Sequence, residues 1–96
     1  MDEWNTVEVD LADNITTIAS AYPVLVKGVI VNVALSAHAC PVMDGTVQKN
    51  VIPASAFAGN AYPFGPARFE TSCIIDPDDA ATGKISVVYR GLARDL

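Results

Sequence analysis

Residues 24–36 read VLVKGVIVNVALS, and this stretch decides the fold. β-Branched residues dominate it, and their crowded side chains favour extended backbone over helix. Period-two alternation puts its side chains on two faces, Leu25, Val29, Val31, Val33 and Leu35 on the first and Val24, Val26, Gly28, Ile30 and Asn32 on the second. Because both faces are mostly apolar, the pattern predicts a central strand or one covered by a neighbouring subunit.

Gly28 inside this strand predicts a bulge or bend that lets one strand serve two sheets. Outward from it, alternation predicts further short strands, at residues 5–11, 15–18, 40–43, 47–52, 68–75 and 84–90. Asp44-Gly45 predicts a hairpin turn and residues 76–83 a loop. Apolar residues almost never recur at the three- and four-residue spacing of a helix. Seven or eight short strands therefore predict an all-β fold, an antiparallel β-sandwich or small barrel, in a single domain over residues 1–96.

Residues 54–66, ASAFAGNAYPFGP, differ from the rest in being rich in small residues, glycine, proline and aromatics. Two prolines cannot donate to a strand ladder, so the segment predicts a long ordered loop or a short edge strand. Its aromatics, Phe57, Tyr62 and Phe64, are candidate interface anchors, because rigid apolar side chains lose little entropy on binding. The alternative is that they cap the open end of the sandwich. Residues 1–6, with Trp4, are a second candidate contact, a docking arm.

Composition excludes several classes of function. The 96 residues are 51% hydrophobic and 18% charged, with a net charge of −5. Six scattered basic residues among eleven acidic ones argue against nucleic-acid binding and against adhesion to an anionic membrane. No apolar run reaches the roughly 20 residues that span a bilayer, and the acidic start, MDEW, is unlike a secretory signal. A domain this small buries a thin core, which favours self-association.

Candidate chemical groups are few. Ser36, His38 and Cys40 lie close in the sequence, but no nucleophile signature accompanies them, so we expect no catalysis. The acidic loop 76–79, DPDD, lacks the ligand spacing of a calcium loop and is read as a turn. Cys40 and Cys73 predict two buried thiols rather than a disulfide framework. We therefore expect neither a metal nor a cofactor.

Two segments carry a resemblance to a known group of proteins. Residues 24–45, VLVKGVIVNVALSAHACPVMDG, hold a G-V-x-V-N strand before a short strand that ends in D-G. Residues 64–90, FGPARFETSCIIDPDDAATGKISVVYR, hold an R-F-x-T strand, an acidic loop and a closing I-x-V-x-Y-R strand. Together they resemble small decoration proteins of tailed-bacteriophage capsids. The chain departs from that group at Ser72-Cys73, where a small residue and glycine are usual, and at Pro66.

The resemblance implies a jelly-roll-like β-sandwich on the capsid surface of a virion, assembled in the host cytoplasm. Decoration, or cement, proteins bind the outer surface of the major capsid protein shell and bridge capsomers, commonly as homotrimers. The expectation is thus a structural protein and not an enzyme. One alternative is a tail or fibre adaptor, or head-binding module, of a phage virion. Another is a carbohydrate-binding or adhesion module, for which only Tyr62 and Phe64 offer the exposed aromatics required.

Overall fold

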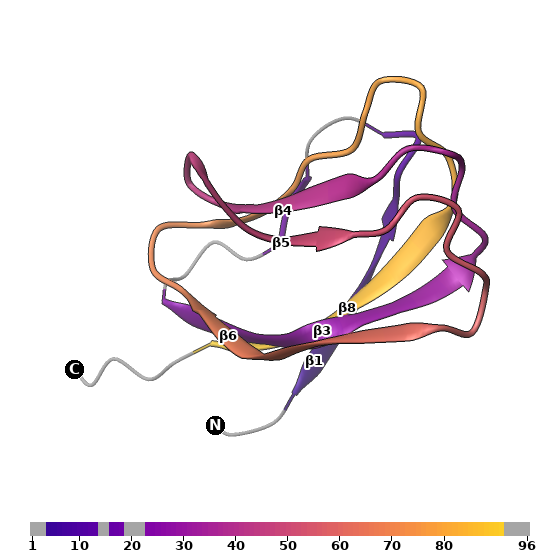
Figure 1. Cartoon of the computed structure of the whole chain (residues 1–96). Helices are drawn as coiled ribbons and strands as arrows, with labels where there is room; N and C mark the ends of the chain where they lie inside the picture. The colour runs from indigo at the N-terminus through magenta and orange to yellow at the C-terminus, as the bar shows by residue number, and fades with distance from the viewer. Residues whose placement is uncertain (1–3, 14–15, 19–22, 92–96) are drawn as a thin grey trace.

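The computed structural model describes residues 4–13, 16–18 and 23–91, which form two antiparallel sheets of four strands packed face to face (Figure 1). Sheet A contains, in spatial order, β1 (Asn5–Asp10), β8 (Lys84–Gly91), β3 (Val24–Val33) and β6 (Ala61–Phe69). Sheet B contains β2 (Thr16–Thr17), β7 (Cys73–Ile75), β4 (Cys40–Asp44) and β5 (Val47–Ile52). The described residues include no helix. The predicted all-β antiparallel sandwich is confirmed.

The order of the strands follows one nested scheme. β1 pairs with β8, β2 with β7, β3 with β6 and β4 with β5, as if one long hairpin had been rolled up. The β3–β8 and β4–β7 pairings then join these ladders into the two sheets. Eight strands in two such sheets constitute the jelly-roll topology.

The core between the sheets is aliphatic, with Phe69 as its largest fully buried side chain. Among the described residues no polar or charged side chain is buried. The inward face of sheet A supplies side chains from all four of its strands, including Val9, Val24, Val26, Val29, Val31, Phe69, Ile85 and Val87. Sheet B supplies Cys40, Val42, Ile52, Cys73 and Ile75. A core without polar groups offers cohesion but no internal site for chemistry.

β3 is a central strand, as predicted, and Gly28 marks a bulge, also as predicted. The predicted division of its faces is wrong, however, because the bulge shifts the alternation by one residue. Val24 and Val26 before the bulge, and Val29 and Val31 after it, therefore all point into the core. The shift turns Ile30 outward, where 41% of it is exposed. β3 belongs to sheet A alone, so the idea that it serves two sheets is also wrong.

The predicted loop at residues 54–66 is only partly correct. Residues 61–66 belong to the nine-residue strand β6, which lies at the edge of sheet A. An edge position tolerates Pro63 and Pro66, because only one side of the strand must supply hydrogen bonds. Residues 53–60 do form a loop, fixed to β3 by hydrogen bonds between the backbone of Val31 and that of Gly59 and Asn60.

The single strand predicted at residues 68–75 is in fact two strands in different sheets. β6 ends at Phe69 and β7 begins at Cys73, and the chain crosses between the sheets over the three residues in between. The Asp44 carboxylate accepts hydrogen bonds from the backbone N–H groups of Glu70, Thr71 and Ser72, at 3.0, 2.8 and 3.1 Å. The crossing depends on a long-range contact, which local alternation does not register.

Replacing Asp44 with Asn should destabilise the protein by about 2 kcal/mol near neutral pH, because hydrogen bonds to a charged acceptor are the stronger kind. Partial burial acts to raise the Asp44 pKa, but the three N–H donors and nearby Lys49 outweigh it, so this pKa lies below its ordinary 3.8. The stabilisation is therefore complete above the unfolded-state pKa and is lost as pH falls through the folded one. Urea unfolding from about pH 6 down to about pH 2.5 should show the two proteins converging in acid.

Asp79→Asn is the matched control, because the Asp79 side chain is exposed and forms no hydrogen bond or ion pair with a described residue. This variant should match the wild type throughout the same pH series. A difference between Asp44→Asn and wild type that stays constant down to the lowest pH would contradict the assigned role of the carboxylate.

Candidate functional site

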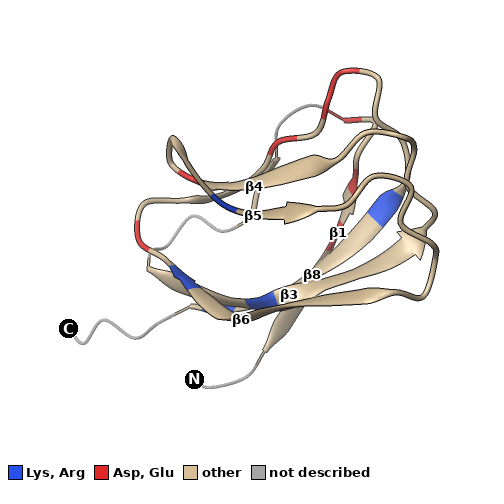
Figure 2. Ribbon diagram, in the orientation of Figure 1, with Lys and Arg blue, Asp and Glu red and all other residues tan. Residues whose placement is uncertain are grey.

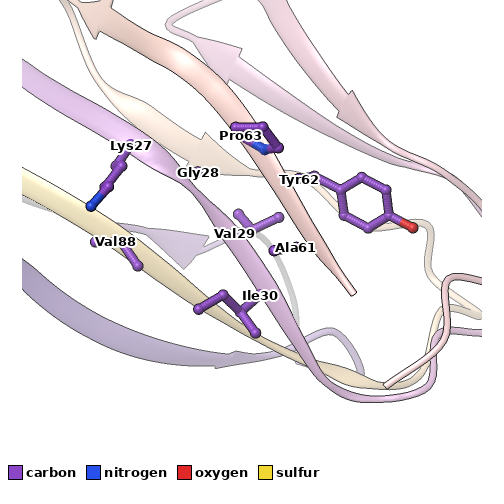
Figure 3. Close-up of a pocket in the computed structure, with 8 residues that line it drawn as sticks. All are labelled: Lys27, Gly28, Val29, Ile30, Ala61, Tyr62, Pro63 and Val88. Atoms are coloured by element: carbon purple, nitrogen blue, oxygen red, sulfur yellow. The ribbon is translucent and has the colours of Figure 1, made fainter. Parts of the chain in front are cut away.

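The strongest candidate for a binding surface is the outer face of sheet A, the face turned away from sheet B. Its centre is apolar, with Ile30 on β3 and the half-buried Val88 on β8. These residues border a pocket of about 290 Å³ (Figure 3), lined by Lys27, Gly28, Val29, Ile30, Ala61, Tyr62, Pro63 and Val88. An antiparallel sheet with one solvated face normally carries polar side chains there, so an apolar centre indicates a contact surface. We call this cavity the outer pocket.

The bulge at Gly28 shapes the outer pocket. A Cβ atom at this position would lie 2.5 Å from the Tyr62 carbonyl oxygen and 2.9 Å from the Pro63 Cα atom. Only glycine therefore allows β6 to approach β3 this closely. In Figure 3 the Tyr62 ring points away from Lys27, Ile30 and Val88, in keeping with its packing against the core. Tyr62 does not place its ring beside these outward side chains.

A cluster of one aromatic and two basic side chains lies at one end of this face. Trp4 directly precedes β1, and its ring centroid lies 4.8 Å from the Arg90 guanidinium carbon and 5.5 Å from the Lys27 Nζ atom. Arg90 is on β8 and Lys27 on β3, so three neighbouring strands bring the group together. We call Trp4, Lys27 and Arg90 the cationic cluster. Cation–π contacts of this kind hold an exposed indole in place.

The opposite end of the face is polar. Asn32 on β3 donates hydrogen bonds through Nδ2 to the Glu8 carboxylate, at 3.1 Å, and to the Ser86 hydroxyl, at 2.7 Å. These three residues tie β1, β8 and β3 together on their solvent side. The outer face thus runs from a cationic cluster, over an apolar pocket, to a neutral and acidic end.

The four residues predicted as interface anchors do not form one surface. Trp4 is 37% exposed and belongs to the cationic cluster. Phe57 is 72% exposed, in the loop bonded to the far end of β3. Tyr62 and Phe64 are half-buried and pack against the core, which favours the capping alternative for this pair. Residues 1–3 of the predicted docking arm lie outside the described residues, and residues 5–6 belong to β1. Docking itself stays a prediction.

Sequence reasoning missed Ile30, Val88, Lys27 and Arg90. The apolar character of both faces of residues 24–36 was the available signal for Ile30. No local sequence pattern reveals that Lys27 and Arg90 contact the same indole, because that contact depends on the β3–β8 pairing.

No model of a known protein family matches this chain. No curated protein and no solved structure matches it either. The geometry of the outer face therefore has to support the functional assignment.

Ser36, His38 and Cys40 do not come together as a catalytic group. The Ser36 hydroxyl accepts a hydrogen bond from the Thr82 backbone N–H at 3.1 Å, which joins two loops. His38 lies with its Nδ1 atom 3.8 Å from an Asp78 carboxylate oxygen. Cys40 is fully buried in the core. Each of the three side chains thus has a different environment.

The acidic loop at residues 76–79 has a local structural role. The Asp78 carboxylate accepts a hydrogen bond from the Ala80 backbone N–H at 2.9 Å, and its carbonyl accepts one from Ala81, also at 2.9 Å. Over residues 4–13, 16–18 and 23–91, no three His, Cys, Asp or Glu side chains gather as metal ligands would. Nor does that part of the chain contain a helix long and apolar enough to cross a membrane.

The two cysteines lie apart on neighbouring strands. Cys73 pairs with Asp44, four residues along β4 from Cys40, and neither cysteine forms a disulfide. This register puts their Cα atoms roughly 14 Å apart, beyond the reach of a disulfide. Burial, with a smaller effect of Asp76, raises the pKa of Cys40 to about 11, and burial with the Asp44 charge raises that of Cys73 to about 12.

We expect neither thiol to react with a disulfide reagent in the folded protein, because both are buried and a raised pKa leaves almost no thiolate at neutral pH. In denaturant both should react quickly. Absorbance of the released thiolate, followed near pH 8 with and without urea, measures this. Rapid labelling of the native protein would contradict the burial described here.

Proposed function

We propose that this chain is a structural virion protein that decorates a bacteriophage head. It binds the major capsid shell through the outer face of sheet A and bridges neighbouring capsomers. The observation that carries the proposal is the apolar centre of that face, with Ile30, Val88 and the outer pocket. The free energy falls when another protein covers such an apolar surface.

Two further observations support the proposal. The fold is a jelly roll, an architecture common among viral capsid and lectin domains, although a fold alone never fixes a function. The sequence segments 24–45 and 64–90 resemble capsid decoration proteins. Binding to the assembled shell only would stabilise that shell by mass action.

The test is co-sedimentation with purified heads that lack the protein. Val88→Lys and Ile30→Lys put a charge into the outer pocket, and each should weaken head binding at least tenfold. Val47→Lys is the control, since Val47 is 61% exposed on β5 of sheet B. It should bind like the wild type. Equal binding by all three variants would contradict the proposed face, and heads lacking the protein that withstand heat and packaged DNA equally well would contradict the function.

Copy number separates the head from the tail. A decoration protein occurs in a number set by the subunits of the whole shell, whereas a tail or fibre adaptor matches a single ring. Quantitative mass spectrometry of purified particles gives this ratio. Sedimentation equilibrium of the isolated protein tests the expected homotrimer.

The glycan-binding alternative is less well supported. It needs flat, exposed aromatic rings, but Tyr62 and Phe64, the pair that suggested it, pack against the core. Hits for the wild-type protein on a glycan array, lost on changing Trp4, would favour it over the present proposal.

A further inference from the structure

The cationic cluster carries two positive charges that have no acidic partner among the described residues. Neither Lys27 nor Arg90 forms an ion pair with a described residue, and their recorded contacts are to the Trp4 ring. By contrast, Arg68 on β6 is already paired with Glu70. Two cations beside one indole repel each other, so an anion between them would be favoured.

The cationic cluster lies on a protein whose overall charge is negative. In Figure 2 several of the described Lys and Arg residues lie on strands of sheet A, whereas most Asp and Glu colour β1, turns and loops. The chain as a whole has a net charge of −5. A local positive site on a negative protein selects ligands by charge and orients them as they approach.

The cationic cluster is continuous with the outer pocket, because Lys27 belongs to both. An apolar side chain seated between Ile30 and Val88 would bring a neighbouring carboxylate of the same segment close to Lys27 and Arg90. Arginine binds carboxylates through paired hydrogen bonds, and the adjoining indole excludes water from one side.

We propose that the outer face of sheet A recognises a short acidic segment of a partner protein, with an apolar side chain in the outer pocket and a carboxylate on Lys27 and Arg90. This inference rests on the proposed function in taking the ligand to be a protein surface. The charge on the face argues for a short segment, since Glu8 and Asp10 lie on β1 of the same sheet. A longer polyanion such as a nucleic acid strand would be repelled there.

Trp4 provides the measurement, because it is the only tryptophan in the chain. The probes are three capped synthetic peptides that share one leucine and differ at two flanking positions, occupied by glutamate, glutamine or lysine. Titration followed by Trp4 fluorescence should give the glutamate peptide at least fivefold tighter binding than the glutamine peptide. The preference should shrink as NaCl screens the charges.

Lys27→Gln with Arg90→Gln should remove the preference for glutamate and leave the circular-dichroism spectrum unchanged. Arg68→Gln is the matched control on the same sheet and should retain the preference, since that cation is already paired. Equal binding of the glutamate and glutamine peptides, or no binding of either, would overturn the inference. So would a single-stranded oligonucleotide that binds more tightly than the glutamate peptide.

The head-binding assay separates this inference from the proposed function. If the Lys27/Arg90 double variant sediments with heads like the wild type, the acidic-segment inference fails and decoration stands. If the wild type does not bind heads but still prefers the glutamate peptide, the proposed decoration function is wrong and the acidic-segment inference is supported.

Discussion

Phe69→Ala should lower the free energy of unfolding by about 3–5 kcal/mol, the usual cost of emptying a buried aromatic site. Phe69 is the largest fully buried side chain among the described residues and ends β6 opposite Val24. Surrounding aliphatic side chains come from both sheets, which cannot collapse onto the space without breaking their ladders. A domain of this size has only about 5–15 kcal/mol in total, so the variant should lose a large share of its stability.

Phe57→Ala removes the same atoms from the surface and is the matched control. The Phe57 side chain is 72% exposed, so its loss should change stability by less than about 0.5 kcal/mol. Urea unfolding monitored by Trp4 fluorescence compares the two variants. An equal loss of unfolding free energy in Phe69→Ala and Phe57→Ala would contradict the packing between the sheets described here.

Gly28→Ala should lower the free energy of unfolding by about 3 kcal/mol, near the upper end of the range for adding a methyl group to filled space. The added methyl would meet the backbone of Tyr62 and Pro63, at 2.5 and 2.9 Å, and a backbone cannot rotate aside as a side chain can. The strain should push β6 away from β3 and alter the outer pocket. The same variant should therefore bind heads more weakly than its stability alone predicts.

Gly91→Ala is the control for Gly28→Ala. A Cβ atom at Gly91, the last residue of β8, would have no neighbour within 4 Å in the described part of the chain. Its stability should stay within about 0.5 kcal/mol of wild type. Thermal unfolding followed by circular dichroism gives both values. A Gly28→Ala protein as stable as Gly91→Ala would mean that β3 and β6 lie farther apart than described.

Local alternation predicted most strands, because residues 5–11, 40–43, 47–52 and 84–90 each hold enough side chains to show which face is apolar. It failed where a tertiary contact decides the structure. The crossing from β6 to β7 depends on Asp44, more than twenty residues away. β6 itself was obscured by two prolines, which an edge position accepts and a local pattern does not reveal.

The candidate site was harder to predict than the fold. Trp4 was identified as part of the predicted docking arm at residues 1–6, and its side chain is exposed. Its partners Lys27 and Arg90 looked like isolated surface charges, since their meeting requires the β3–β8 register. Ile30 was predicted on the same face as Val24 and Val26, but the bulge at Gly28 leaves those two buried and turns Ile30 outward.

The nested pairing of strands has a consequence for biosynthesis. Asn5 and Thr6 pair with Tyr89 and Val88, so the first described strand must wait for the last one before it acquires a neighbour in sheet A. Pairings this distant in sequence form slowly, since a long loop must close before they contribute. Among the described strands, only the β4–β5 hairpin, at the middle of the chain, can form early from local contacts. A ribosome therefore has to release residue 89 before the sandwich can close, and until then the nascent apolar strands are exposed to the cell's chaperones.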